Sequence, residues 1–129
     1  MLLVDGANVV GSRPAGWGPT PWWRDRAGAA RVLVKRLRAA VGSGLLTGPV
    51  VVVLEGAARP GAEEGTSDGV DVVHAPGEGD DTLAELAAAA TAAGRPVTLV
   101  SADRGLAERV RGVGAEVVGP RWLLDRLPS

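Results

Sequence analysis

The first residues, Met1-Leu-Leu-Val-Asp-Gly-Ala-Asn-Val-Val-Gly11, decide the fold of this chain. The apolar run from Leu2 to Val4 stops at Asp5, and Gly6 follows at once. A short apolar run without alternation is typical of a strand that is buried on both faces of a parallel sheet. Such α/β folds bind ligands at the carboxyl ends of their strands. The stretch therefore predicts a strand that carries a carboxylate to the ligand-binding edge of a sheet.

Apolar runs predict strands at residues 2–4, 50–54, 70–74, 97–100 and 115–118. Helical spacing of apolar residues predicts helices over residues 24–41, 81–93 and 104–111, with a last short helix from Pro120. The glycine-rich segments 9–23 and 56–69 show no periodicity and are expected to be loops. Strands separated by helices imply right-handed crossovers, so we expect an α/β fold, a three-layer α/β/α sandwich with a central parallel sheet of about five strands.

The composition indicates one domain over residues 1–129. Four Trp and no Phe or Tyr leave Val, Leu and Ala to form the core. The absence of cysteine excludes disulfides, thiolate metal sites and a thiol nucleophile. No apolar run approaches the roughly 18 residues of a membrane span, and no signal peptide is visible. We therefore expect a cytoplasmic protein without a membrane partner.

Charge is distributed unevenly along the chain. Residues 11–38 hold seven Arg or Lys and one acid, whereas residues 55–85 hold nine acids and one Arg. A phosphate-rich partner suits the first segment and a cation suits the second. Charged faces of solvated helices and loops explain the same pattern without any partner.

Carboxylates follow the predicted strands at Asp5, Glu55 and Asp103, and Asp80 and Asp81 stand where a helix begins. Carboxyl ends of parallel strands share one edge, so we expect these acids to meet around a divalent metal. Mg²⁺ and Mn²⁺ prefer oxygen ligands, and a bound ion lowers the pKa of water and stabilises charge on a phosphate. Each acid alone also has a structural explanation as a helix cap, a turn residue or a solvated residue.

Basic and aromatic side chains lie in or just after the first loop, which leaves the same edge as Asp5: Arg13, Trp22 and Arg24. Arg contacts to phosphate and Trp stacking on bases commonly hold single-stranded nucleic acid. Alternatively, one of Trp22 and Trp23 anchors the loop to the domain.

Three motifs in order resemble NYN domains, the YacP-like branch of the PIN-like nuclease superfamily. They are Val-Asp-Gly-Ala-Asn-Val-Val-Gly at residues 4–11, Gly-Asp-Asp-Thr-Leu at 79–83 and Val-Ser-Ala-Asp-Arg-Gly-Leu at 100–106. The pattern Glu-Gly-Asp-Asp at 78–81 is also similar to the Glu-x-Asp-Asp of related 5′-nucleases. The resemblance spans most of the chain and implies a PIN-like fold.

The resemblance further implies a metal-dependent ribonuclease that uses Mg²⁺ or Mn²⁺ to cleave single-stranded or structured RNA. Carried over by position, Asp5, Asp81 and Asp103 become the catalytic metal ligands. Asp80 is a near-equal candidate beside Asp81, and Glu55 is a further candidate ligand. The oligomeric state stays open, with a homodimer as one option.

By the same resemblance, Asn8 orients a ligand or the substrate phosphate, and Ser101 supports Asp103 or contacts a metal-bound water. Arg104 contacts phosphate or pairs with a neighbouring acid. Relatives usually carry Asp where Glu55 stands, and the 5′-nucleases carry a second Asp where this chain has Gly105. These two departures favour the alternative function, a non-catalytic RNA-binding PIN-like module. A receiver-like signalling domain is disfavoured, because the acid pair opens a helix instead of following the first strand.

Overall fold

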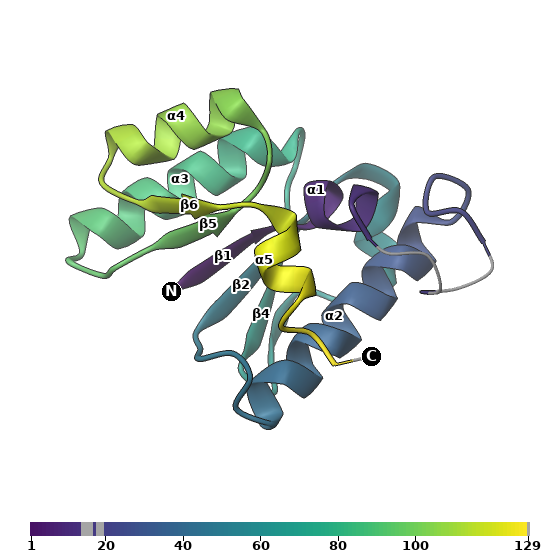
Figure 1. The fold of residues 1–129 in the computed structure, drawn as a ribbon. Helices are drawn as coiled ribbons and strands as arrows, with labels where there is room; N and C mark the ends of the chain where they lie inside the picture. Colours follow the sequence, from purple (N-terminus) through teal and green to yellow (C-terminus); the bar gives the residue numbers. More distant parts are fainter. Residues whose placement is uncertain (14–16, 18–19, 129) are drawn as a thin grey trace.

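The computed structural model describes residues 1–13, 17 and 20–128, and it contains a six-stranded sheet in the order β3-β4-β2-β1-β5-β6 (Figure 1). Five of the strands run parallel, with β1 in the centre, and β3 is antiparallel at one edge. The strands are β1 (Leu2–Asp5), β2 (Val50–Leu54), β3 (Gly65–Ser67), β4 (Val70–His74), β5 (Thr98–Val100) and β6 (Glu116–Val118). The prediction of an α/β fold around a parallel sheet is confirmed.

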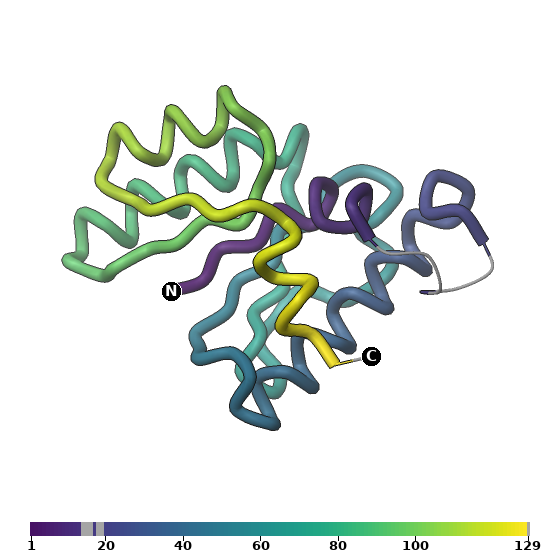
Figure 2. The backbone as a smooth tube through the Cα atoms, viewed as in Figure 1, coloured from purple at the N-terminus to yellow at the C-terminus, as the bar shows by residue number. Residues whose placement is uncertain are grey.

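Helices cover both faces of the sheet, as Figures 1 and 2 show. One layer holds α1 (Gly6–Gly11), α2 (Arg26–Gly42) and α5 (Pro120–Leu124). The opposite layer holds α3 (Gly79–Ala92) and α4 (Arg104–Gly112). The two layers and the sheet form the expected three-layer sandwich.

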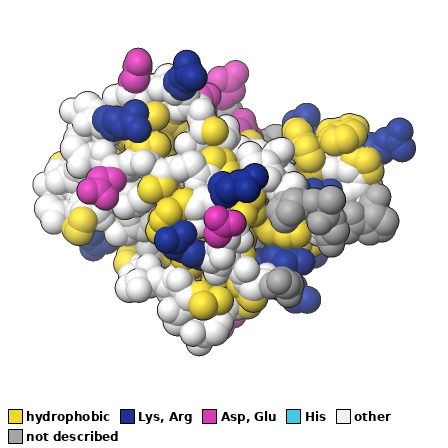
Figure 3. All heavy atoms as spheres, in the orientation of Figure 1, with side chains coloured by type: hydrophobic (Ala, Val, Ile, Leu, Met, Phe, Trp, Pro, Cys, Tyr) yellow, Lys and Arg dark blue, Asp and Glu magenta, His cyan; other side chains and the backbone are white. Residues whose placement is uncertain are grey.

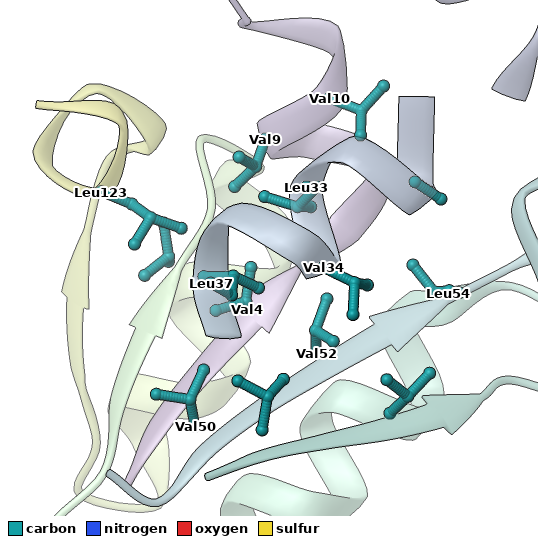
Figure 4. Close-up of a cluster of buried hydrophobic side chains, with 14 of the residues drawn as sticks. Val4, Val9, Val10, Leu33, Val34, Leu37, Val50, Val52, Leu54 and Leu123 are labelled. Atoms are coloured by element: carbon teal, nitrogen blue, oxygen red, sulfur yellow. The ribbon is translucent and has the colours of Figure 1, made fainter. Parts of the chain in front are cut away.

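Two apolar clusters fill the space between the sheet and the helix layers. Successive side chains of a strand point to opposite faces, so Val4 lies in the α1/α2/α5 cluster and Leu3 lies in the α3/α4 cluster. Figure 4 shows the first cluster, in which Leu33 and Leu37 of α2 pack over Val4 and Val52. Each fully buried Leu side chain contributes about 1.5–3 kcal/mol relative to an exposed one. The central strands are therefore held from both sides.

The register of the strands brings three polar residues to one edge of the sheet. Asp5 ends β1 in register with Val53 of β2, and Glu55 follows two residues later. Ser101 follows the last residue of β5. Asp5, Glu55 and Ser101 each come two residues after a member of the α3/α4 cluster, and residues two apart in a strand share a face. All three are therefore directed to the side of the sheet on which α3 begins.

The predicted loop at residues 9–23 is only partly a loop. Helix α1 covers residues up to Gly11, and Val9 and Val10 are buried in it. Six residues are too short a helix to show periodicity in the sequence. Residues 14–16 and 18–19 of the predicted loop lie outside the described part of the chain.

The second predicted loop, residues 56–69, contains a 3₁₀ helix, η1 (Gly56–Gly61), and the strand β3. All three residues of β3 are exposed, so the strand lacks the apolar pattern by which buried strands are found. A two-residue turn at Asp68 and Gly69 joins β3 to β4, with φ values of 52° and 78°. Positive φ at both positions is typical of the type I′ hairpin turn. The expectation of about five strands, all parallel, therefore misses one antiparallel edge strand.

Two helix starts differ from the prediction by two residues. Helix α2 begins at Arg26, because the side chain of Asp25 accepts a hydrogen bond from the backbone N–H of Gly28 and caps the helix. Helix α3 begins at Gly79, which places both Asp80 and Asp81 in its first turn. None of the helices in the described part of the chain combines the length and hydrophobicity that a membrane-spanning helix requires.

Candidate functional site

Asp5 is the most deeply buried of the predicted site carboxylates, with 5% of its surface exposed. Its Oδ1 accepts a hydrogen bond from the backbone N–H of Asn8 at 3.3 Å, which caps α1. Its Oδ2 accepts a hydrogen bond from the Ser101 hydroxyl at 2.8 Å. Both oxygens are thus oriented by the protein, one by the adjacent helix and one by the end of β5.

Ser101 and Asn8 link the end of β1 to the end of β5. The Ser101 oxygen accepts the backbone N–H of Asp103 at 3.1 Å while its hydroxyl donates to Asp5. The side-chain oxygen of Asn8 accepts the backbone N–H of Ala102 at 2.8 Å. These contacts hold the backbone of residues 101–103 against α1, so Asn8 and Ser101 lie where the sequence places them, beside the acids.

Asp103 and Glu55 are both tied to helix starts. Asp103 accepts the backbone N–H of Leu106 at 3.0 Å and so caps α4. Glu55 Oε2 accepts the backbone N–H of Gly79, the first residue of α3, at 3.1 Å. A Cβ atom on Gly79 would lie 3.2 Å from the other Glu55 oxygen, so glycine permits this close approach. Asp103 and Glu55 therefore each accept a hydrogen bond from the start of a helix and also lie at the predicted site.

Asp80 interacts electrostatically with Asp5, Glu55 and Asp103, and we call these four carboxylates the acid cluster. Burial raises the pKa of Asp5 to about 6, with smaller contributions from the charges of Asp80 and Glu55, against the opposing hydrogen bonds from Ser101 and Asn8. Partial burial and the charges of Asp103, Glu55 and Glu78 also raise the pKa of Asp80, against the opposing charge of Arg109. Burial, with repulsion between like charges as the smaller cause, therefore favours protonation or a bound cation at this edge.

Asp81 has a different environment from Asp80. Its carboxylate forms an ion pair with Arg109 of α4 at 3.0 Å, and its side chain is 76% exposed. Adjacent residues of a helix point about 100° apart, so only one of the two first-turn acids can face the strand ends. The geometry brings Asp80 to the acid cluster and directs Asp81 toward α4.

The donor atoms of the acid cluster suit Mg²⁺ or Mn²⁺, because all of them are carboxylate oxygens. Within residues 1–13, 17 and 20–128, however, no three Asp, Glu or His side chains stand close enough together to hold an ion. Glu55, Asp80 and Asp103 are only half-buried, so their carboxylates are accessible from solvent. The chain thus provides the ligand type that these ions prefer.

The predicted basic and aromatic contacts fall on two sides of the acid cluster. Arg104 is exposed at the start of α4 and lines a groove of about 370 Å³ together with Ser101 and Asp103. On the other side, Arg24 is exposed before α2, and the guanidinium of Arg13 donates to the backbone oxygen of Thr20.

The two adjacent tryptophans differ in environment. Trp22 is half-buried and packs against the α1/α2/α5 cluster, which fits the prediction that one of Trp22 and Trp23 anchors the loop. Trp23 is 60% exposed and meets Trp22 edge to face. Figure 3 shows hydrophobic and basic side chains side by side over the segment that leads into α2.

Three features of the site were not predicted from the sequence: the ion pair of Arg109, the anchoring of Glu55 by Gly79, and the position of Arg26. Arg26 lies with its guanidinium carbon 5.6 Å from the centre of the Trp22 ring. The first two features are contacts between elements far apart along the chain. Trp22 precedes the start of α2 at Arg26, so helical spacing in the sequence does not predict their contact.

No family model matches this chain, and no curated protein matches it. Two solved structures of Rae1 (YacP) from Bacillus subtilis do match its fold. The structure of a single-residue Rae1 mutant superposes with a TM-score of 0.66 at 21% sequence identity, over 96% of this chain and 71% of Rae1. The chain has the fold of Rae1. A second Rae1 structure gives a TM-score of 0.64 at 23% identity, over 97% of this chain and 71% of Rae1. The similarity to Rae1 agrees with the YacP-like fold that the three motifs predict.

Proposed function

We propose that this protein is a metal-dependent ribonuclease that hydrolyses RNA phosphodiester bonds at the acid cluster. The observation that carries the proposal is the buried Asp5 beside other carboxylates, with the pKa of Asp5 raised to about 6. Burial and, to a smaller extent, the neighbouring carboxylates disfavour the charged Asp5, and perturbed carboxylates of this kind concentrate at functional sites. The fold shared with Rae1 and the motifs that resemble YacP-like NYN domains support the same function.

In this proposal the ligands of Mg²⁺ or Mn²⁺ are Asp5 and Asp103, with Asp80 and Glu55 as the further carboxylates of the cluster. A bound ion supplies a water of lowered pKa and offsets charge on the scissile phosphate. Ser101 holds Asp5 through its hydroxyl and the backbone of Asp103 through its oxygen. It therefore fixes the relative positions of two ligands, which is the support that metal ligands need from neighbouring groups.

The proposed path of the RNA crosses the carboxyl edge of the sheet. Arg104 stands on one side of the acid cluster and is free to contact a phosphate on the α4 side. Trp22 and Arg24 stand on the α2 side, where an aromatic ring and a cation suit a base and a phosphate. A single strand that spans both sides places a phosphate over Asp5.

The second candidate function is a non-catalytic RNA-binding module. One observation favours it: in the described part of the chain, no three acidic or His side chains are close enough to hold an ion as they stand. The basic and aromatic residues on both sides of the edge serve RNA binding equally well with or without a metal. The two functions differ in whether bound RNA is cut.

The experiment is a cleavage assay on labelled single-stranded and hairpin RNA with Mg²⁺, with Mn²⁺ and with EDTA. We expect cleavage with a metal only, and a loss of at least about 100-fold for Asp5→Asn and Asp103→Asn, because each substitution removes a metal ligand. Asp125→Asn is the matched control, since Asp125 is exposed at the end of α5. RNA binding without cleavage under any condition would establish the binding module instead.

A further inference from the structure

A pocket of about 260 Å³ lies beside the acid cluster, between α1, the start of α2 and η1. Trp22 and Arg26 form the wall on the α2 side, and Val10 lies on the α1 side. Glu55 and Gly56 line the edge nearest to the sheet. The pocket therefore joins the predicted RNA-binding side of the molecule to the strand ends that carry the acids.

We infer that this pocket binds one unpaired nucleobase of the RNA strand whose phosphate lies at the acid cluster. The inference rests on the proposed function and specifies its substrate as RNA with an unpaired base next to the cleaved bond. Trp22 provides the stacking surface, Arg26 fixes the ring, and the apolar wall of α1 closes the pocket on the other side.

The environment of Trp22 makes it a rigid surface for stacking. It packs partly against the α1/α2/α5 cluster, and the Arg26 guanidinium carbon lies 5.6 Å from its ring centre. An aromatic ring in such a wall binds bases of any identity, because every base has a π-face. A ring that is already held in place also loses little conformational entropy when the base enters.

The size of the pocket and its charges fit a base better than a larger ligand. Its volume of about 260 Å³ is below the range of about 300–1,000 Å³ for pockets that hold drug-sized molecules. Arg26 and Glu55 are the charged side chains among its described lining residues. An apolar pocket with few polar groups suits a flat, mostly aromatic group that offers hydrogen bonds only at its edges.

The position of the pocket couples it to the acid cluster. Gly6 lines the pocket and directly follows Asp5 in the chain. Glu55 lines the pocket and also belongs to the acid cluster, where it is anchored to Gly79. Glu55 thus borders both the pocket and the acid cluster, so a base held here brings its nucleotide to the strand ends that carry the acids.

The test is RNA binding without cleavage, measured in EDTA by the fluorescence anisotropy of a 5′-labelled single-stranded oligonucleotide. Trp22→Leu removes the stacking ring and keeps an apolar side chain, whereas Ala58→Leu narrows the pocket and leaves Trp22 in place. We expect each to raise the Kd about tenfold or more, in line with the loss of one stacked base. Trp22→Phe keeps an aromatic ring and is expected to retain most of the binding. Trp23→Leu, the matched control outside the pocket, is expected to leave the Kd unchanged.

A second measurement removes single bases from the RNA, one abasic position at a time. At the position that the pocket holds, the abasic RNA is expected to bind about tenfold more weakly to the wild-type protein and no more weakly to Trp22→Leu. The inference is overturned if Trp22→Leu and Ala58→Leu bind like the wild type, if Trp23→Leu is equally weakened, or if the wild type binds no RNA. If this binding pattern appears and no metal supports cleavage, the base pocket stands and the ribonuclease proposal fails.

Discussion

Asp5→Asn is expected to stabilise the folded protein above pH 6 while it abolishes the proposed activity. The folded protein raises the pKa of Asp5 from 3.8 to about 6, chiefly by burial, so the native state holds the proton more tightly than the unfolded chain does. The contribution of Asp5 to the free energy of unfolding is therefore largest below pH 3.8, falls as the pH rises toward 6, and stays lower above that.

The magnitude follows from the size of the shift. About two pKa units at about 1.4 kcal/mol each correspond to a cost of about 3 kcal/mol for the ionised Asp5 at neutral pH. Asp5 is 5% exposed, so solvent screening reduces this cost little. An Asn side chain does not ionise, still accepts the N–H of Asn8, and can donate its amide N–H to the Ser101 oxygen. The pKa of about 6 already includes the hydrogen bonds from Ser101 and Asn8, so we expect a gain of up to about 3 kcal/mol.

The assay is urea unfolding of the wild type and of Asp5→Asn in EDTA between pH 4.5 and 8. The difference in the free energy of unfolding is expected to grow in favour of the variant up to about pH 6 and then to level off. Asp125→Asn serves as the control for removal of one exposed charge. A variant that is less stable than the wild type at pH 8, with an unchanged pH dependence, would refute the account of Asp5.

Three further substitutions test particular contacts of the site. Ser101→Ala removes the hydroxyl that donates to Asp5. We expect it to lower the free energy of unfolding in urea by about 1–3 kcal/mol and to remove most of the cleavage activity. Asp80→Asn is expected to reduce cleavage at least about tenfold. Asp81→Asn loses only an exposed ion pair, so we expect it to keep the activity and to change the free energy of unfolding by less than about 1 kcal/mol. Equal activity losses in the two variants would contradict the assignment of Asp80 to the acid cluster. Gly6→Ala places a Cβ 2.6 Å from a backbone oxygen of β2 and is expected to cost about 1–3 kcal/mol, which thermal unfolding measures.

The sheet could be predicted largely because buried parallel strands require continuous apolar runs. β1 and β2 are buried at every position, and their sequences show it directly. β3 has three exposed residues and no such requirement, so the pattern missed it. The dipeptide Asp68-Gly69 next to the apolar run of β4 was the available signal, because two-residue hairpin turns favour it.

The location of the site could also be predicted, because strand ends of a parallel sheet meet at one edge. Its internal assignments depend on contacts that the sequence does not encode locally. Asp80 and Asp81 are adjacent and alike, and the packing of α3 on the sheet turns Asp80 toward the acid cluster and leaves Asp81 exposed beside Arg109. In the same way, Trp22 and Trp23 differ only through tertiary packing, which buries one and exposes the other.

The most direct test of the account is to measure Mn²⁺ binding to the purified protein by titration calorimetry at pH 7.5. We expect saturable binding to the wild type and to Asp125→Asn, and an affinity at least about tenfold weaker for Asp5→Asn and Asp103→Asn, because each removes a carboxylate ligand. Equal Mn²⁺ affinity in all four proteins, or no binding to the wild type, would contradict the claim that Asp5 and Asp103 share a cation.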